Sequence, residues 1–311
     1  MAELVSIAII SKDRPQVLIE CLNDLVLKIP KNIPLMVVDS SNSSENVEAI
    51  YDYINSNKDL HNRTFIDQVD LIRGSQPEQR NICLNHCKTP YILFIDDDCF
   101  FRDDTFNLFL SFLDMNKDRN VLGCRINQAT TQKMSIRNLP NMSLIKWSQG
   151  SFNIDSNDIK EVDHLQGTFM CFKLDKLKSI GGFNENLIKG YAPFEETYST
   201  LKMSKIFDQK PLINYGICVD HSLAPRLQGA SRDLGLDSNN SFAYGRNGMI
   251  TSKMYFGNLK TFFAIPIIMA FMVLRMLRPI FKSPASIFVR IKSSIHLIFG
   301  MISGLFNVKG S

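Results

Sequence analysis

One stretch decides the fold of this chain: Tyr91-Ile92-Leu93-Phe94-Ile95-Asp96-Asp97-Asp98-Cys99. Its apolar run, with β-branched and aromatic members, predicts a buried central strand that delivers three consecutive carboxylates to a sheet edge. Because adjacent anions repel one another, a divalent cation or the hydrogen-bond donors of a ligand must compensate them. Hard oxygen ligands suit Mg²⁺ or Mn²⁺. The simpler alternative, a polar strand end before a helix cap, accounts for one or two of these acids but not for three.

The residues before this strand alternate between strand-like and helix-like patterns. Apolar runs predict strands at residues 5–11 and 33–38 and a third around Val69–Ile72, whereas helical spacing predicts helices at 15–28, after 45 and at 78–86. Alternating strands and helices indicate a doubly wound α/β sheet with mostly parallel strands.

Acids follow three of these predicted strands. Asp13 comes after the first, Asp39 ends the second and Asp96–Asp98 end the central one. In doubly wound sheets ligands bind beyond the carboxyl ends of the strands, so we expect these acids to line one site. The first turn, Ser11 to Pro15, lacks the glycine pattern that cradles a dinucleotide pyrophosphate, which argues against such a cofactor.

The second half of the chain adds further candidates. Helices are expected at 103–115 and 174–180, and strands at 121–126, 167–173 and 211–220, the last of these leading to His221. A helix beginning near Pro193 carries Glu195 and Glu196 in its first turn, where they serve either the helix dipole or a catalytic base. For His221 a ligand role and a structural role are equally open.

Composition and charge narrow the class of protein. The chain has 311 residues, of which 45% are hydrophobic, enough for one large α/β domain with appendages. The formal charge of +4 is unevenly distributed, because no acid follows Asp237 and the last 74 residues carry +9. A basic, apolar tail favours contact with an anionic membrane over nucleic acid.

The cysteines predict a reducing compartment. There are seven, an odd number, and most lie within apolar runs, so we expect no disulfide framework. Cys83, His86 and Cys87 resemble half of a zinc site, but no second half with ligand spacing lies nearby. The short apolar run at 5–10 follows no basic region and is not expected to be a signal peptide.

The ordered motifs of roughly the first 250 residues resemble family 2 glycosyltransferases of the GT-A type. The matching motifs are Ser11-Lys12-Asp13-Arg14-Pro15, Val37-Val38-Asp39, Gln79-Arg80-Asn81, Asp96-Asp97-Asp98, Gly181-Gly182-Phe183-Asn184-Glu185, Glu195-Glu196 and His221. The resemblance implies a GT-A catalytic domain over residues 1–240, with a nucleotide-binding half at 1–115 and an acceptor half at 116–240. A helical, basic, amphipathic extension would occupy residues 241–311.

The resemblance also implies roles for individual residues. It implies that a nucleoside-diphosphate sugar is bound by Ser11, Asp13, Asp39, Arg80, Asp96 and Asp97. It implies that Asp98 binds Mn²⁺ or Mg²⁺, with His221 as a further ligand of the metal or the diphosphate. The Gly-Gly-Phe segment would lie near the acceptor and the donor sugar.

The second acid of the family's Glu-Asp pair is the catalytic base. Glu196 takes that position here, and Glu195 stays open as its alternative, because Glu replaces the usual Asp. The extra methylene moves the carboxylate by more than about 1 Å. Tyr198 and Lys202 also replace an acid and an arginine that are common in the family.

The tail offers two interpretations. Phe262–Leu274 is uncharged but shorter than the roughly 20 residues needed to span a bilayer. From Ile287 onward an apolar stripe fits a helix lying in the interface of an anionic membrane, whereas packing on the catalytic domain or on a second copy is a close competitor. Arg246-Asn247 before this tail resembles bacterial rhamnosyltransferase-like members, which act on lipid-linked glycans.

These observations predict a cytoplasmic-face, metal-dependent, inverting glycosyltransferase. It would pass a sugar from a UDP- or dTDP-sugar to a glycan or lipid-linked glycan in cell-surface polysaccharide synthesis. We expect it to act at the inner membrane and to bind no nucleic acid, and a homo-oligomer is possible. A phosphatase of the D-x-D-x-T type is disfavoured because Phe100 stands where Thr or Val is required. A non-catalytic, membrane-docked sugar-nucleotide binder is the other alternative.

Overall fold

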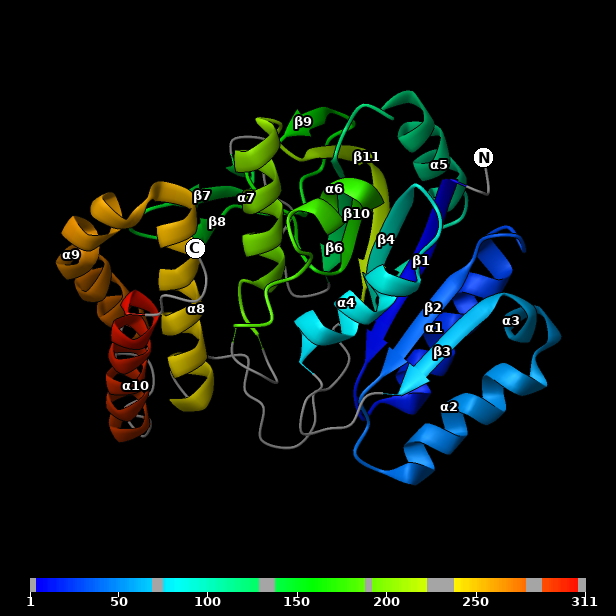
Figure 1. The fold of residues 1–311 in the computed structure, drawn as a ribbon, viewed down its shortest axis with the longest axis horizontal. Helices are drawn as coiled ribbons and strands as arrows, with labels where there is room; N and C mark the ends of the chain where they lie inside the picture. The colour runs from blue at the N-terminus through cyan, green and yellow to red at the C-terminus, as the bar shows by residue number, and fades with distance from the viewer. Residues whose placement is uncertain are drawn as a thin grey trace.

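The computed structural model describes residues 4–68, 75–128, 138–187, 192–222, 238–277 and 287–306. A curved sheet forms the middle layer, and helices cover both of its faces (Figure 1). Three further helices lie at the end of the molecule opposite the β3 edge. The predicted α/β class with a doubly wound mixed sheet is therefore confirmed.

The sheet has nine strands in the described part of the chain, in the order β3-β2-β1-β4-β10-β6-β11-β5, with β9 paired to β11. The first four run parallel, β10 runs antiparallel to both of its neighbours, and β11 is parallel to β6. Strands β7 and β8 form a separate hairpin. The strands are β1 (Val5–Ser11), β2 (Leu35–Asp39), β3 (Thr64–Gln68), β4 (Tyr91–Asp96), β5 (Cys99–Phe101), β6 (Val121–Gln128), β7 (Asn141–Ser143), β8 (Trp147–Gln149), β9 (Ile159–Glu161), β10 (Phe169–Lys173) and β11 (Leu212–His221).

The helices divide between the two faces of the sheet and the C-terminal end. Side chains of α1, α2, α3 and α5 share one core with the sheet, and those of α4, α6 and α7 share the core on its other face. The helices are α1 (Pro15–Lys28), α2 (Ser44–Ser56), α3 (Lys58–Arg63), α4 (Gln76–His86), α5 (Thr105–Met115), α6 (Leu174–Ser179), α7 (Glu195–Phe207), α8 (Ser238–Phe256), α9 (Asn258–Leu277) and α10 (Ile287–Leu305).

Local sequence explains where the elements around the site begin. Every residue of β1 is buried, as expected for a strand covered on both faces. Pro15 occupies the first turn of α1, where its missing N–H leaves no hydrogen bond unmade. A capping box formed by Ser75 and Glu78 starts α4 and thereby orients the helix that carries Arg80.

Some boundaries differ from expectation. The third strand expected around Val69–Ile72 falls outside the described residues, and the structure places β3 directly before it, where Thr64, Phe65 and Ile66 pair with β2. The short strands β5, β7, β8 and β9 were not predicted, because three residues are too few for a recognisable pattern.

The C-terminal helices pack as a group. Helix α8 contacts α7, α9 and α10, and its Met249 shares a small core with Trp147, Phe194, Ile268 and Met301. The expected helical extension is thus present, and it begins at Ser238. The division into domains at residue 240 stays a prediction.

Candidate active site

Parallel pairing brings the predicted acids to one edge of the sheet. Ser11 lies opposite Asp39, and Ile10 lies opposite Asp96, so the ends of β1, β2 and β4 coincide. The sequence-based expectation that these strands aim their acids at one rim agrees with this register.

A cluster of three possible metal ligands lies at the end of β4. The Nε2 of His221 is 3.0 Å from Oδ1 of Asp98 and 3.8 Å from Oδ2 of Asp96, and one ligand atom from each residue lies within 4.8 Å of the others. His221 reaches this place because the end of β11 pairs with β5, opposite Cys99. Two carboxylates and an imidazole form a donor set that fits Mn²⁺ or Mg²⁺.

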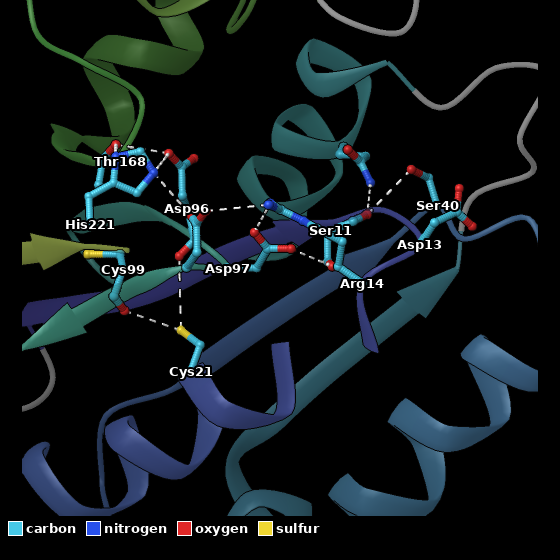
Figure 2. A network of polar contacts seen from close by, with 12 residues as sticks. Ser11, Asp13, Arg14, Cys21, Ser40, Asp96, Asp97, Cys99, Thr168 and His221 are labelled. Carbon is cyan, nitrogen blue, oxygen red and sulfur yellow. Dashed lines mark hydrogen bonds and ion pairs between the residues drawn. The ribbon is translucent and has the colours of Figure 1, made fainter. Parts of the chain in front are cut away.

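Two residues that the sequence did not single out, Thr168 and Gln128, contact this cluster, and Figure 2 shows Thr168 beside Asp96 and His221. The hydroxyl of Thr168 donates to Oδ2 of Asp96 at 2.9 Å and lies 3.2 Å from Nδ1 of His221. The side-chain amide of Gln128 lies 2.9 Å from the same Nδ1. Metal ligation through Nε2 requires the proton on Nδ1, which Thr168 Oγ1 can accept while donating to Asp96. The Gln128 amide would then turn so that its oxygen, and not its nitrogen, faces Nδ1.

The middle acid of the triplet points elsewhere. Asp97 is 1% exposed, forms an ion pair with Arg14 and accepts a hydrogen bond from Ser11 Oγ at 2.8 Å. Burial raises the pKa of Asp97 to about 7, although Arg14 and Ser11 act in the opposite direction. Its carboxylate thus fixes the first turn of the chain to the central strand, and its predicted role toward the donor stays a prediction.

The turn after β2 forms a second polar patch. Asp39 is buried and accepts hydrogen bonds from the backbone N–H and the hydroxyl of Ser41, while burial raises its pKa. Asp13, in the left-handed region with φ 53°, accepts from the backbone and side chain of Asn42. Both acids therefore lie on one rim beside Ser11, where the predicted nucleotide would bind.

Arg80 and Glu195 form a buried ion pair beside this rim. Their side chains are each 2% exposed, and Nη2 of Arg80 lies 3.7 Å from Oδ1 of Asp96. The guanidinium also lies 5.6 Å from the ring centroid of Phe183 and 6.0 Å from that of Phe94. Arg80 thus joins the start of α7 to the end of β4.

Glu196 is the more accessible acid of the pair. It is half-buried, and loss of hydration raises the pKa of its carboxyl, while its backbone hydrogen bond and the charge of Arg80 oppose that rise. The negative charge of Asp96 raises the pKa further. Glu196 directly follows Glu195, whose partner Arg80 lies 3.7 Å from Asp96, so it lies at the start of α7 beside the metal cluster, where a general base is expected.

This geometry can be compared with known proteins. The model of the glycosyl transferase family 2 matches residues 6–181, which is more than half of the chain. The chain belongs to this family. It is therefore a glycosyltransferase, and the matched segment contains β2, β4, the Asp triplet and all of β1 except Val5.

Solved structures share the fold of this family 2 chain. The mannosyltransferase PcManGT from Pyrobaculum calidifontis, in complex with GDP-Man and Mn²⁺, has a TM-score of 0.59 at 12% identity, over 98% of this chain and 87% of its own. GalNAc-T7 with UDP, GalNAc and Mn²⁺ has a TM-score of 0.59 at 13% identity, over 79% and 50%. S. aureus TarS 1-349 with UDP-GlcNAc has a TM-score of 0.54 at 14% identity, over 96% and 91%. No curated protein sequence matches the chain significantly.

In this glycosyltransferase the C-terminal helices hold the start of α7. Phe194, its N-cap residue at φ 71°, packs against Trp147 and Tyr244 at ring-centroid distances of 5.6 and 4.7 Å. The side chain of Asn247 donates to the carbonyl of Pro193 at 3.1 Å. A Cβ at Gly248 would come within 2.5 Å of the Trp147 ring, so glycine permits this close packing. Helix α8 therefore positions the two acids.

A polar cavity of about 420 Å³ lies beside the Gly-Gly-Phe segment. The Nδ2 atom of Asn184 is buried there and has no hydrogen-bond partner in the described part of the chain. The cavity is lined by Asn81, Ile180, Gly181, Gly182, Phe183, Asn184, Glu185, Asn186, Tyr198 and Lys202. Tyr198 and Lys202, the two departures from the family pattern on α7, thus belong to this cavity.

Proposed function

We propose that the chain is an inverting glycosyltransferase that depends on Mn²⁺ or Mg²⁺ and uses a UDP- or dTDP-sugar. The observation that carries this proposal is the link made by Arg80, which pairs with Glu195 at the start of α7 and lies 3.7 Å from Asp96 of the Asp96–Asp98–His221 cluster. The complexes of PcManGT and TarS with GDP-Man and UDP-GlcNAc support nucleotide sugars as the class of donor.

The residues divide the reaction between them. Asp98, Asp96 and His221 would hold the divalent cation, which supplies charge stabilisation for the departing nucleoside diphosphate. Glu196 takes the proton of the acceptor hydroxyl as its oxygen forms the new bond to the anomeric carbon. The bond from that carbon to the diphosphate oxygen breaks, and its electron pair leaves with the diphosphate. A single displacement inverts the anomeric centre.

The acceptor is proposed to be a glycan or a lipid-linked glycan. The polar cavity beside the Gly-Gly-Phe segment offers amides, a carboxylate and an aromatic ring, the groups that bind sugar hydroxyls. Arg246-Asn247 and the basic tail support a rhamnosyltransferase-like enzyme of bacterial cell-surface polysaccharide synthesis, at the cytoplasmic face of the inner membrane.

Calorimetry tests the donor class. Among UDP, dTDP, GDP and CDP, we expect UDP or dTDP to bind the parent protein with Mn²⁺ present, and this binding to be lost in Asp98→Ala. If none of the four binds folded protein, the proposed donor class is wrong. Binding without turnover of any sugar would favour a non-catalytic sugar-nucleotide binder.

A further inference from the structure

Helix α10 packs against α8 through small and polar side chains and through the buried Leu297 and Met301. A Cβ at Gly300 would lie 2.1 Å from the carbonyl oxygen of Phe242, and one at Gly304 would lie 2.3 Å from that of Arg246. Ser293 and Ser294 on the same helix are buried. The Gly300–Gly304 spacing therefore serves contact within the chain, and α10 turns its other side outward.

The outward side is apolar. Seven large apolar side chains on α10 or directly after it are exposed, from 42% for Ile302 to 84% for Phe288. Helix α9 adds five more, among them Phe262 at 58% and Phe263 at 72%. We name these twelve the apolar face: Leu259, Phe262, Phe263, Ile267, Leu274, Phe288, Val289, Ile291, Ile295, Phe299, Ile302 and Phe306.

This face departs from the rest of the protein surface. Of the 17 large apolar side chains exposed in the described residues, twelve belong to it and five are spread over the much larger remainder. Scattered single exposed apolar residues are normal, whereas a concentration of them on two neighbouring helices marks an interaction surface. The outward side of α10 is apolar, although Leu297 and Met301 already supply a buried apolar side, whereas a helix on a water-soluble protein usually turns polar residues outward.

Charge identifies the partner. Lys260 on α9 and Lys292 on α10 are exposed, and no acid occurs in the sequence after Asp237. A second copy would bring an equally basic surface against this one, so like charges would oppose self-association. An anionic lipid headgroup layer above an acyl region complements both the lysines and the apolar side chains.

We propose that the apolar face docks the enzyme onto the surface of an anionic membrane, with α9 and α10 lying in the interface. Within the described residues α10 is the one helix whose length and composition would allow it to cross a bilayer, over Phe288–Leu305. Its packing along α8 argues against crossing, because α8 carries Arg246 and Lys253 and continues into the contact with α7. Lying flat keeps α8 on the catalytic domain.

The position of the face suits the proposed acceptor. Helices α9 and α10 lie at the α7 side of the molecule, and β3 and α2 lie at the opposite end (Figure 1). A membrane at the apolar face would therefore be closer to Glu196 than to the outer strands of the nucleotide half. The advantage of bringing Glu196 near a lipid-linked acceptor rests on the proposed function, whereas the docking of the apolar face onto a membrane does not rest on it.

Vesicle co-sedimentation of the full chain tests the proposal. The probes are vesicles of phosphatidylcholine alone and of phosphatidylcholine with phosphatidylglycerol. The test variant is Phe262→Asp combined with Phe299→Asp, and the matched control is Leu27→Asp, whose leucine on α1 is 83% exposed in the catalytic body. A charge variant, Lys260→Glu with Lys292→Glu, tests the lysines.

We expect the parent and the Leu27→Asp control to bind the anionic vesicles, and the double Phe variant to bind at least about tenfold more weakly. The charge variant should lose the preference for phosphatidylglycerol. Thermal unfolding and nucleotide binding should be unchanged in all variants, which separates lost docking from misfolding and from failure of the proposed donor site. Absence of vesicle binding by the parent, or equal binding by the double Phe variant, would overturn the proposal. So would a dimer of the parent in solution that the double Phe variant abolishes.

Discussion

The end of β4 and the start of α7 both carry consecutive acids, and the structure gives these acids different surroundings at the two places. Each presents its acids to one site, and in each an arginine lies nearest to one acid, although Arg14 also lies 3.4 Å from Asp98 and Arg80 3.7 Å from Asp96. Asp97 pairs with Arg14 beside Asp96 and Asp98, while Glu195 pairs with Arg80 beside Glu196. At β4 the acids that remain converge on His221, whereas at α7 the remaining Glu196 has a raised pKa.

The difference shows how neighbouring acids acquire different roles. Two acids that converge on one point suit a cation, and a single, partly desolvated acid suits proton transfer. We expect the paired acids, Asp97 and Glu195, to position their neighbours. We therefore expect that no acid within Asp96–Asp98 or within Glu195–Glu196 can take over the role of its neighbour.

The largest effect is expected at the metal cluster. Replacing Asp98 with Ala removes a ligand and should lower kcat/KM on the order of a thousandfold or more. Mn²⁺-dependent nucleotide binding should be lost with it, and the melting temperature should stay near that of the parent. Near-parental activity in Asp98→Ala at all Mn²⁺ concentrations would contradict the assignment.

The buried pair at α7 should instead govern stability. Glu195→Gln removes the nearest partner charge of the buried Arg80 and leaves Asp96 at 3.7 Å, so it should lower the free energy of unfolding by up to about 3–5 kcal/mol. Denaturant unfolding measures this change, and Glu161→Gln is the matched control. Glu161 is 50% exposed and pairs with Arg119, so its loss should cost about 0–1 kcal/mol. Equal effects of the two substitutions would show that the Arg80 pair is not structural.

A smaller effect is expected from the residue that orients His221. Thr168→Val removes the hydroxyl between Asp96 and His221 and should weaken Mn²⁺ binding by about 10- to 100-fold. Thr168→Ser keeps the hydroxyl and should bind Mn²⁺ nearly as the parent does. Calorimetric titration with Mn²⁺ alone measures this without turnover. A loss of the same size in Thr168→Ser would point to packing of the methyl group instead.

The smallest effect is a shift of the pH profile. Because burial raises the pKa of Glu196, kcat should fall as the pH drops through a value above the 4.5 of an ordinary glutamate. Protonated Glu196 cannot accept the acceptor's proton. The pH dependence of kcat at saturating substrates measures this limb, which should be missing from the residual activity of Glu196→Gln. A limb retained in that variant would assign it to another group.

Much of the fold followed from local sequence, because buried parallel strands are continuous apolar runs that end at their acids. The predictions of β1, β2 and β4 were correct for this reason, and the helices α1 and α7 also followed from local sequence. Contacts between distant segments could not be predicted. Thr168 reaches Asp96 only because β10 inserts antiparallel beside β4, with Phe169 opposite Ile95.

The same limit explains the ion pairs. Nothing in the sequence tells which acid of Asp96–Asp98 or of Glu195–Glu196 will meet an arginine from another element. Arg80, predicted from family resemblance to contact the donor, is buried against Glu195, and contact with the donor stays a prediction. The contact of Phe194 with Tyr244 could not be predicted either, because Tyr244 lies on α8, far along the chain.

The most direct test of this division of roles is a comparison of Glu196→Gln with the parent, measuring nucleotide-sugar affinity with Mn²⁺ and single-turnover rate on one sample. We expect unchanged donor affinity and a rate lower by about a hundredfold to ten-thousandfold. A variant that transfers sugar at the parental rate would show that Glu196 is not the base.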